Sequence, residues 1–86
     1  MFSAQVTVTN NTGLHARPAS QLVELCKKFE SQLVLKHGDV MVDPKSIISI
    51  LAAGIKQGTT IEITAEGPDE AEAGAGVQAF IEGLVE

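Results

Sequence analysis

One short segment, Gly13-Leu14-His15-Ala16-Arg17-Pro18-Ala19, holds the residues best suited to chemistry. His15 is one of only two histidines, and Arg17 is the only arginine. A histidine imidazole ordinarily titrates near pH ~6.5, so its neutral form is a nucleophile at physiological pH. A guanidinium is permanently charged, and its planar fork matches phosphate oxygens. The pair predicts a histidine nucleophile with a phosphate-binding group beside it.

This segment joins a predicted strand to a predicted helix. Apolar and polar residues alternate from Phe2 to Thr9, and the turn cluster Asn10-Asn11-Thr12-Gly13 follows. From Ala16 to Phe29 apolar residues recur at helical spacing, with Pro18 in the first turn, where a missing N–H costs little. Because a helix start favours anions, we expect the backbone of Ala16 and Arg17 to help bind phosphate.

The rest of the chain reads as alternating strands and helices. We expect strands over 32–37, 40–42 and 59–65, a helix over 46–53 ended by Gly54, and a last helix capped by Asp69. The buried stripe of that last helix is expected to contain Val77, Phe80, Ile81, Leu84 and Val85. This order predicts one α+β domain over residues 1–86, a two-layer open-faced sandwich with three helices on one face of a four-stranded antiparallel sheet.

Composition excludes several classes of function. A net charge of -5, no Trp or Tyr and only three Phe argue against binding to nucleic acid. No apolar run approaches the ~20 residues of a membrane span and no signal peptide precedes the first strand, so we expect a cytoplasmic protein without membrane insertion. Two histidines and one cysteine show no ligand spacing, so neither a metal nor a cofactor is expected. Cys26 is expected to be a buried hydrophobic residue and His37 a solvated loop residue.

Charge is unevenly distributed along the chain. No lysine or arginine follows Lys56, whereas the stretch from Glu62 to Glu86 holds seven carboxylates. The first two thirds can therefore present a basic or neutral face to an acidic partner protein.

The predicted second helix suggests a second functional region. Ser46 at its start is expected to be an N-cap worth ~1 kcal/mol, and a phosphate on it would also be well placed at a helix start. A helix this short cannot bury all its apolar residues, so we expect Ile47 and Ile48 to be exposed and to dock partners beside His15. The predicted partner-binding residues are Ser20, Glu24, Lys27, Ile47, Ile48, Leu51 and Ala52.

From residue types alone, His15 could be a solvated loop residue, an anion-binding residue or a phosphorylated one. The heptapeptide is, however, very similar to the signature of the HPr family, the histidine phosphocarriers of the bacterial sugar phosphotransferase system. The likeness runs along the whole chain and includes Lys45-Ser46-Ile47-Ile48, which resembles the family's regulatory serine region, and the glycines Gly54 and Gly67.

The resemblance implies a monomeric carrier, not an enzyme. His15 would accept phosphate on Nδ1 from enzyme I, which is charged by phosphoenolpyruvate, and pass it to the IIA component of a sugar transporter. Arg17 would stabilise the phosphoryl group. In Gram-positive relatives a dedicated kinase phosphorylates the serine that matches Ser46, which weakens the interaction with enzyme I.

The sequence departs from the family pattern around Ser46, and it is compatible with more than one function. Asp43-Pro44 precedes Lys45, and Ser49 stands where glycine is usual, so recognition by a serine kinase is an open question. The stretch Glu66-Gly67-Pro68-Asp69-Glu70 resembles carriers of the nitrogen-linked branch, which have regulatory partners. A purely regulatory binding module and an unrelated anion-binding domain also fit the composition of the chain.

Overall fold

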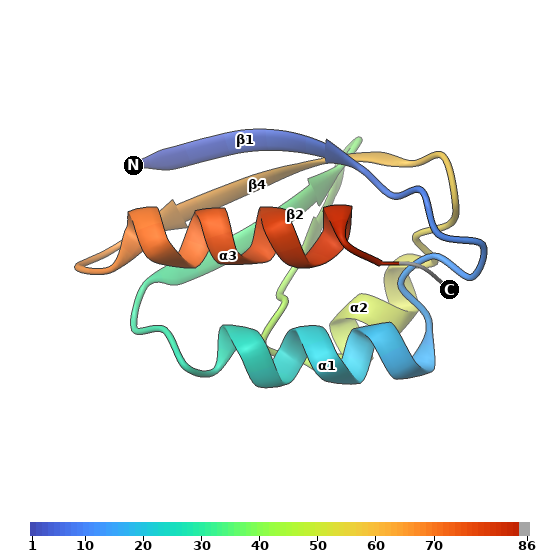
Figure 1. Ribbon diagram of the computed structural model, residues 1–86, viewed down its shortest axis with the longest axis horizontal. Coiled ribbons are helices and arrows are strands. Elements are labelled where there is room, and N and C mark those ends of the chain that lie inside the picture. The colour runs from blue at the N-terminus through green and yellow to red at the C-terminus, as the bar shows by residue number, and fades with distance from the viewer. Residues whose placement is uncertain (85–86) are drawn as a thin grey trace.

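The computed structural model describes residues 1–84, and it has the predicted order of elements (Figure 1). The elements are β1 (Phe2–Thr7), α1 (Ala16–Cys26), β2 (Gln32–His37), β3 (Val40–Val42), α2 (Ile47–Ala53), β4 (Thr60–Glu66) and α3 (Glu70–Glu82). The strands form one antiparallel sheet in the order β1-β4-β2-β3. The three helices lie on one face of it, which confirms the predicted α+β sandwich.

The core lies between the sheet and the helices because strand register aligns apolar residues. Val6 of β1 pairs with Ile61 of β4, and Ile63 of β4 pairs with Leu35 of β2. These four side chains are buried, as is Leu22 of α1. Alternate residues of each strand point the opposite way, so the other face of the sheet carries mainly polar side chains.

Two elements are shorter than predicted. β1 ends at Thr7, although Val8 stays buried and exchanges backbone hydrogen bonds with Gly58 and Thr59. α1 ends at Cys26, and Phe29 follows in a tighter turn, in which its N–H donates to the carbonyl of Cys26 three residues back. The apolar pattern continued to Phe29 because that ring still packs against the core.

Asp69 precedes α3 as predicted, but its side chain does not cap that helix. Its carboxylate instead accepts hydrogen bonds from the backbone N–H groups of Glu30 (3.0 Å) and Ser31 (2.9 Å) and from the Ser31 hydroxyl. The side chain that bonds to the backbone of the turn before α3 is Glu70, whose Oε1 accepts from the Gly67 N–H at 3.2 Å. The predicted local cap was therefore wrong, and Asp69 ties α3 to the loop before β2.

The buried stripe of α3 contains Val77 and Ile81 as predicted, while Phe80 and Leu84 are half-buried and Val85 lies outside the described residues. The helix tolerates Gly74 because the Phe2 ring fills the space in front of it. A Cβ at position 74 would lie 2.0 Å from Cδ1 of Phe2. Close contact with β1 thus replaces the helix propensity that glycine lacks.

The prediction for His37 was wrong. It is the last residue of β2, pairs with Val40, and is half-buried, with a buried Nδ1 that has no hydrogen-bond partner among the described residues. It lies on the same strand face as Leu33 and Leu35, which explains the burial. The prediction for Cys26 is confirmed, because the thiol is fully buried and this burial raises its pKa to about 12.

Within residues 1–84, no helix has the length and apolar character needed to cross a membrane.

Candidate functional site

His15 is exposed and stands at the N-cap position of α1. Its backbone is extended, with φ -105° and ψ -167°, and its carbonyl oxygen accepts from the Ala19 N–H at 2.8 Å, which starts the helix. Its imidazole makes no capping hydrogen bond to the helix. The backbone therefore places the ring at the positive end of the helix dipole, and the ring does not cap the helix with a hydrogen bond.

The first turn of α1 has the features of an anion site. The Ala19 N–H makes the first hydrogen bond of the helix, to the His15 carbonyl oxygen, so the N–H groups of Ala16 and Arg17 lie in the first turn at the positive end of the helix dipole. Pro18 has no N–H and is buried, which fixes the backbone of the turn. Ala16 and Arg17 are both exposed. A phosphate on His15 would therefore lie at a helix start whose first turn also carries the guanidinium-bearing residue Arg17.

The backbone that leads to His15 is held by burial and by hydrogen bonds. Leu14 immediately before it is buried in the core, and its N–H donates to the carbonyl oxygen of Ile55 at 3.0 Å. Gly13 adopts a left-handed conformation with φ 64°, and its N–H donates to the carbonyl oxygen of Asn10. The Asn10 side chain adds a hydrogen bond from Nδ2 to the Gly13 carbonyl oxygen at 2.9 Å. The exposed His15 thus directly follows a buried residue, Leu14, whose backbone is fixed by hydrogen bonds.

Sequence reasoning took Asn10 only as a turn former and missed its side-chain role. The available signal was an asparagine three residues before a glycine, a spacing at which its amide can bond to the backbone of the turn.

Ser46 caps α2 as predicted. Its Oγ accepts from the Ser49 N–H at 3.3 Å, and its own N–H donates to the Asp43 carbonyl oxygen at 3.0 Å. Gly54 ends the helix in the left-handed conformation. The residues that depart from the family pattern complete this turn, because the Asp43 N–H donates to Ser49 Oγ at 2.9 Å and Asp43 Oδ1 accepts from the Lys45 N–H.

α2 packs beside α1 (Figure 1). It presents an apolar surface, which we call the α2 patch and define as Ile47, Ile48 and Leu51. Ile48 is 76% exposed, Leu51 46% and Ile47 37%. Ile50 is the residue of α2 that enters the core. The predicted exposure of Ile47 and Ile48 is confirmed. The remaining predicted partner-binding residues, Ser20, Glu24, Lys27 and Ala52, are also exposed.

Most of the chain is similar to known proteins. The family described as "PTS HPr component phosphorylation site" matches residues 2–83. The chain belongs to the HPr family. The phosphocarrier protein HPr of Buchnera aphidicola subsp. Acyrthosiphon pisum (strain APS) is 42% identical over 73 residues, which cover 85% of this chain and 86% of that protein.

Solved HPr structures have the same fold. HPr-C-His from Thermoanaerobacter tengcongensis superposes with a TM-score of 0.92 at 39% identity, covering 95% of this chain and 92% of that one. An HPr dimer from the same organism gives a TM-score of 0.75 at 39% identity, covering 95% and 94% of the two chains. As a member of the HPr family the chain is a phosphocarrier and not an enzyme.

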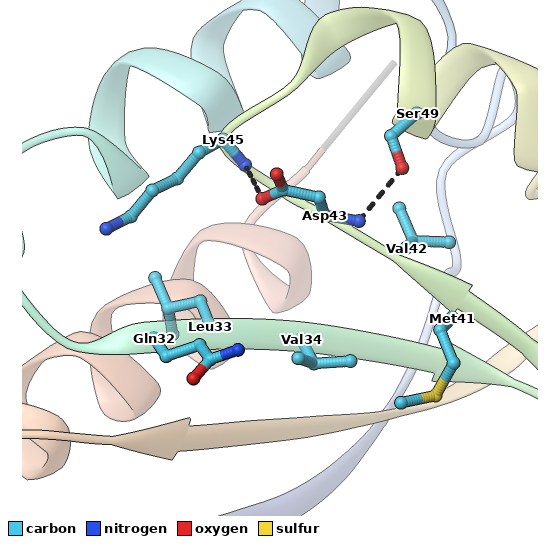
Figure 2. A pocket seen from close by; sticks show the side chains of 8 residues that line it. All are labelled: Gln32, Leu33, Val34, Met41, Val42, Asp43, Lys45 and Ser49. Carbon is cyan, nitrogen blue, oxygen red and sulfur yellow. Dashed lines mark hydrogen bonds between the residues drawn. The ribbon is translucent and has the colours of Figure 1, made fainter.

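Lys45, beside Ser46 in this HPr-family chain, has a structural role. Its Nζ donates to the carbonyl oxygens of Phe29 (2.9 Å) and Ser31 (3.1 Å), which directs the ammonium toward the loop before β2. It also lines a hollow of about 410 Å³ between the diverging ends of β2 and β3 (Figure 2). The hollow is lined by Gln32, Leu33, Val34, Met41, Val42, Asp43, Lys45 and Ser49. None of these belongs to the segment 13–19, so the candidate site is an exposed surface and not this pocket.

Proposed function

We propose that this protein accepts a phosphoryl group on His15 from enzyme I and passes it to the IIA component of a sugar transporter. The observation that carries the proposal is the placement of an exposed imidazole at the N-cap of α1, directly before the backbone donors of Ala16 and Arg17. Membership of the HPr family supports this assignment.

The proposed chemistry is the reversible transfer of a phosphoryl group to and from a ring nitrogen of His15. That nitrogen, Nδ1 by family resemblance, attacks phosphorus as the bond between phosphorus and the phosphorylated donor breaks, and the phosphoryl group moves without water taking part. Its oxygens keep their charge throughout, so the carrier's task is to hold and orient them. Ala16 and Arg17 supply part of that stabilisation. An exposed site leaves the remainder to each partner, which suits a group that must be handed on.

The α2 patch and the exposed face of α1 are the proposed docking surface for both partners. Arg17 and Lys27 give this face positive charge, with Glu24 between them. The carboxylates of β4 and α3 belong to the last third of the chain, after the last lysine, and not to α1 or α2. Such a distribution favours approach of an acidic surface to the His15 end.

The sugar branch is the assignment we favour over the nitrogen-linked branch. Lys45-Ser46-Ile47 matches the sugar-branch carriers. The acidic stretch that resembled the nitrogen branch has a role in this fold, since Asp69 binds Ser31 and Glu70 accepts from Gly67. These acids therefore carry less weight as a sign of regulatory partners.

We also propose that the protein works as a monomer in the cytoplasm. The better superposition on HPr-C-His than on the HPr dimer supports a chain that completes its own fold. The one thiol among residues 1–84 is buried, which suits a reducing compartment.

Regulation at Ser46 is proposed as a second, conditional activity of this surface, with a serine kinase and phosphorylase as its enzymes. The helix start favours a phosphate electrostatically. The neighbouring Asp43 opposes it, because its carbonyl already accepts the Ser46 N–H and its carboxylate is held in the same turn.

Phosphotransfer kinetics with purified partners test the function and the branch. The protein is incubated with phosphoenolpyruvate and either the sugar-branch or the nitrogen-branch enzyme I, and transfer to a IIA protein is followed. We expect faster phosphorylation by the sugar-branch enzyme and transfer onward to IIA. A preference for the nitrogen-branch enzyme would overturn the branch, and absence of covalent phosphate with both would overturn the function.

A further inference from the structure

Asn10 is a polar side chain in the core of the loop that leads to His15. Only 4% of the residue is exposed. Asparagine is seldom buried, and where it is buried its amide usually makes hydrogen bonds. Its Nδ2 donates to the Gly13 carbonyl oxygen at 2.9 Å and to the Thr12 hydroxyl at 3.3 Å. Its Oδ1 is buried without a hydrogen-bond partner among the described residues. The amide therefore acts in this loop as a donor.

The network fixes which way the amide points. If the amide were flipped, Oδ1 would face the Gly13 carbonyl oxygen, and two acceptors would meet without a proton between them. Only Nδ2 can make this contact favourably.

The contact controls one peptide plane next to the phosphorylation site. The carbonyl of Gly13 and the N–H of Leu14 belong to the same peptide unit, and that unit is planar. Asn10 holds its carbonyl end, and the Ile55 carbonyl oxygen holds its N–H end at 3.0 Å. With both ends fixed and the Leu14 side chain buried, the backbone reaches His15 in one orientation.

We propose that Asn10 is a positioning residue for phosphoryl transfer at His15. It sets the direction in which the imidazole meets the incoming phosphorus and does not touch the reacting atoms. The inference rests on the proposed function. Since the proposed docking surface lies on α1 and α2 and not on residues 10–14, loss of the Asn10 amide should leave docking intact and slow the chemical step.

Enzyme I kinetics with Asn10→Ala test this, with Asn11→Ala as the matched control. Asn11 is the exposed neighbour in the same turn. We expect kcat for Asn10→Ala to fall between roughly ten- and a hundredfold, the cost of small misplacements at reacting groups, with KM for the carrier unchanged. Asn11→Ala should keep the wild-type kcat. An unchanged kcat for Asn10→Ala, or an equal fall for Asn11→Ala, would overturn the role.

Two further measurements separate positioning from general loss of stability. Val77→Ala removes a buried side chain of α3, an element outside residues 10–19, and at a temperature where this variant is folded it should transfer at the wild-type rate. Asn10→Asp should be slow at neutral pH but approach the wild-type rate as pH falls, because a protonated carboxyl again donates to Gly13. A slow Val77→Ala, or an Asn10→Asp deficit that is constant with pH, would contradict positioning.

Hydrogen exchange in the wild type needs no variant. The Asn10 side-chain amide protons should exchange slowly with solvent, and fast exchange would overturn the inference even if the Asn10 variants failed to fold. Failure of the proposed function has a different signature, since the wild type itself would then remain unphosphorylated.

Discussion

Gly13 lies directly against the carbonyl oxygen of Ile55. A Cβ at position 13 would stand 2.3 Å from that oxygen and 2.8 Å from the Cα of Lys56, and the backbone at Gly13 is left-handed with φ 64°. The adjacent Leu14 N–H bonds to the same oxygen. Glycine is therefore required at position 13, both for its left-handed backbone and because there is no room for a Cβ. This close approach packs the loop 10–14, which leads to His15, against the residue that follows the C-cap of α2.

We predict that Gly13→Ala lowers the free energy of unfolding by more than the ~1 kcal/mol of left-handed strain alone, because the clash with backbone is added to it. Gly38→Ala is the matched control. Gly38 has nearly the same φ, 60°, but nothing lies within 4 Å of its Cβ position. Urea denaturation of both variants measures the difference. Equal losses would mean that the loop moves away from Ile55 without cost.

Arg17→Lys is expected to slow phosphotransfer while changing the melting temperature little. Lysine keeps the positive charge of this exposed residue but loses the planar fork that binds two phosphate oxygens together. Enzyme I kinetics and thermal unfolding measure the two effects. If Arg17→Ala instead unfolded the protein, the role of Arg17 would be structural.

Ser46→Asp should fold normally and accept phosphate poorly. Aspartate can still cap α2, and its charge suits a helix start, so stability should hold or rise slightly. The same charge would face an enzyme I surface expected to be acidic, which raises KM, and salt should relieve part of the loss. Kinetics at low and high ionic strength for wild type, Ser46→Asp and Ser46→Ala test this. Identical kinetics for all three would reduce Ser46 to a helix cap.

Asp69 is expected to make the free energy of unfolding depend on pH in the acid range. Hydrogen bonds from the Ser31 hydroxyl and from the backbone of Glu30 and Ser31 lower the pKa of its carboxyl. A carboxyl with a lowered pKa in the folded state contributes stability above its ordinary value, near pH ~4, and that stability is lost as pH falls through the lowered pKa.

Asp69→Asn should therefore be less stable than wild type at neutral pH and should lose less stability on acidification. The two proteins should converge at the lowest pH, where Asp69 is protonated and uncharged. Urea denaturation across the acid range measures both curves. A constant gap between them would show that Asp69 acts through packing and not through its charge.

Local pattern predicted most of this fold. Period-two and helical spacing placed every element in order, and Ser46 and Gly54 mark the ends of α2 because a cap acts within its own turn. Contacts between distant segments were not predictable in the same way. Asp69 has the sequence position of a cap, yet its acceptors serve Ser31, 38 residues earlier, which only the tertiary fold brings near.

The candidate site shows the same division. His15 and Arg17 could be proposed as its residues from sequence because their types and spacing are local and resemble a family motif, and their roles stay predictions. The role of Asn10 could not, since an asparagine in a turn reads the same whether its amide faces solvent or the core. The shortness of α2 predicted that Ile47 and Ile48 are exposed, but it did not indicate that Ile50 is the residue of this helix that enters the core.

The central claim, covalent phosphate on His15, is tested most directly by intact mass after incubation with phosphoenolpyruvate and enzyme I. The chain has only two histidines, so His37→Ala is the matched control for His15→Ala. Wild type and His37→Ala should each gain one phosphoryl group that acid removes, and His15→Ala should gain none. An acid-stable adduct, or an adduct that persists in His15→Ala, would contradict the assignment.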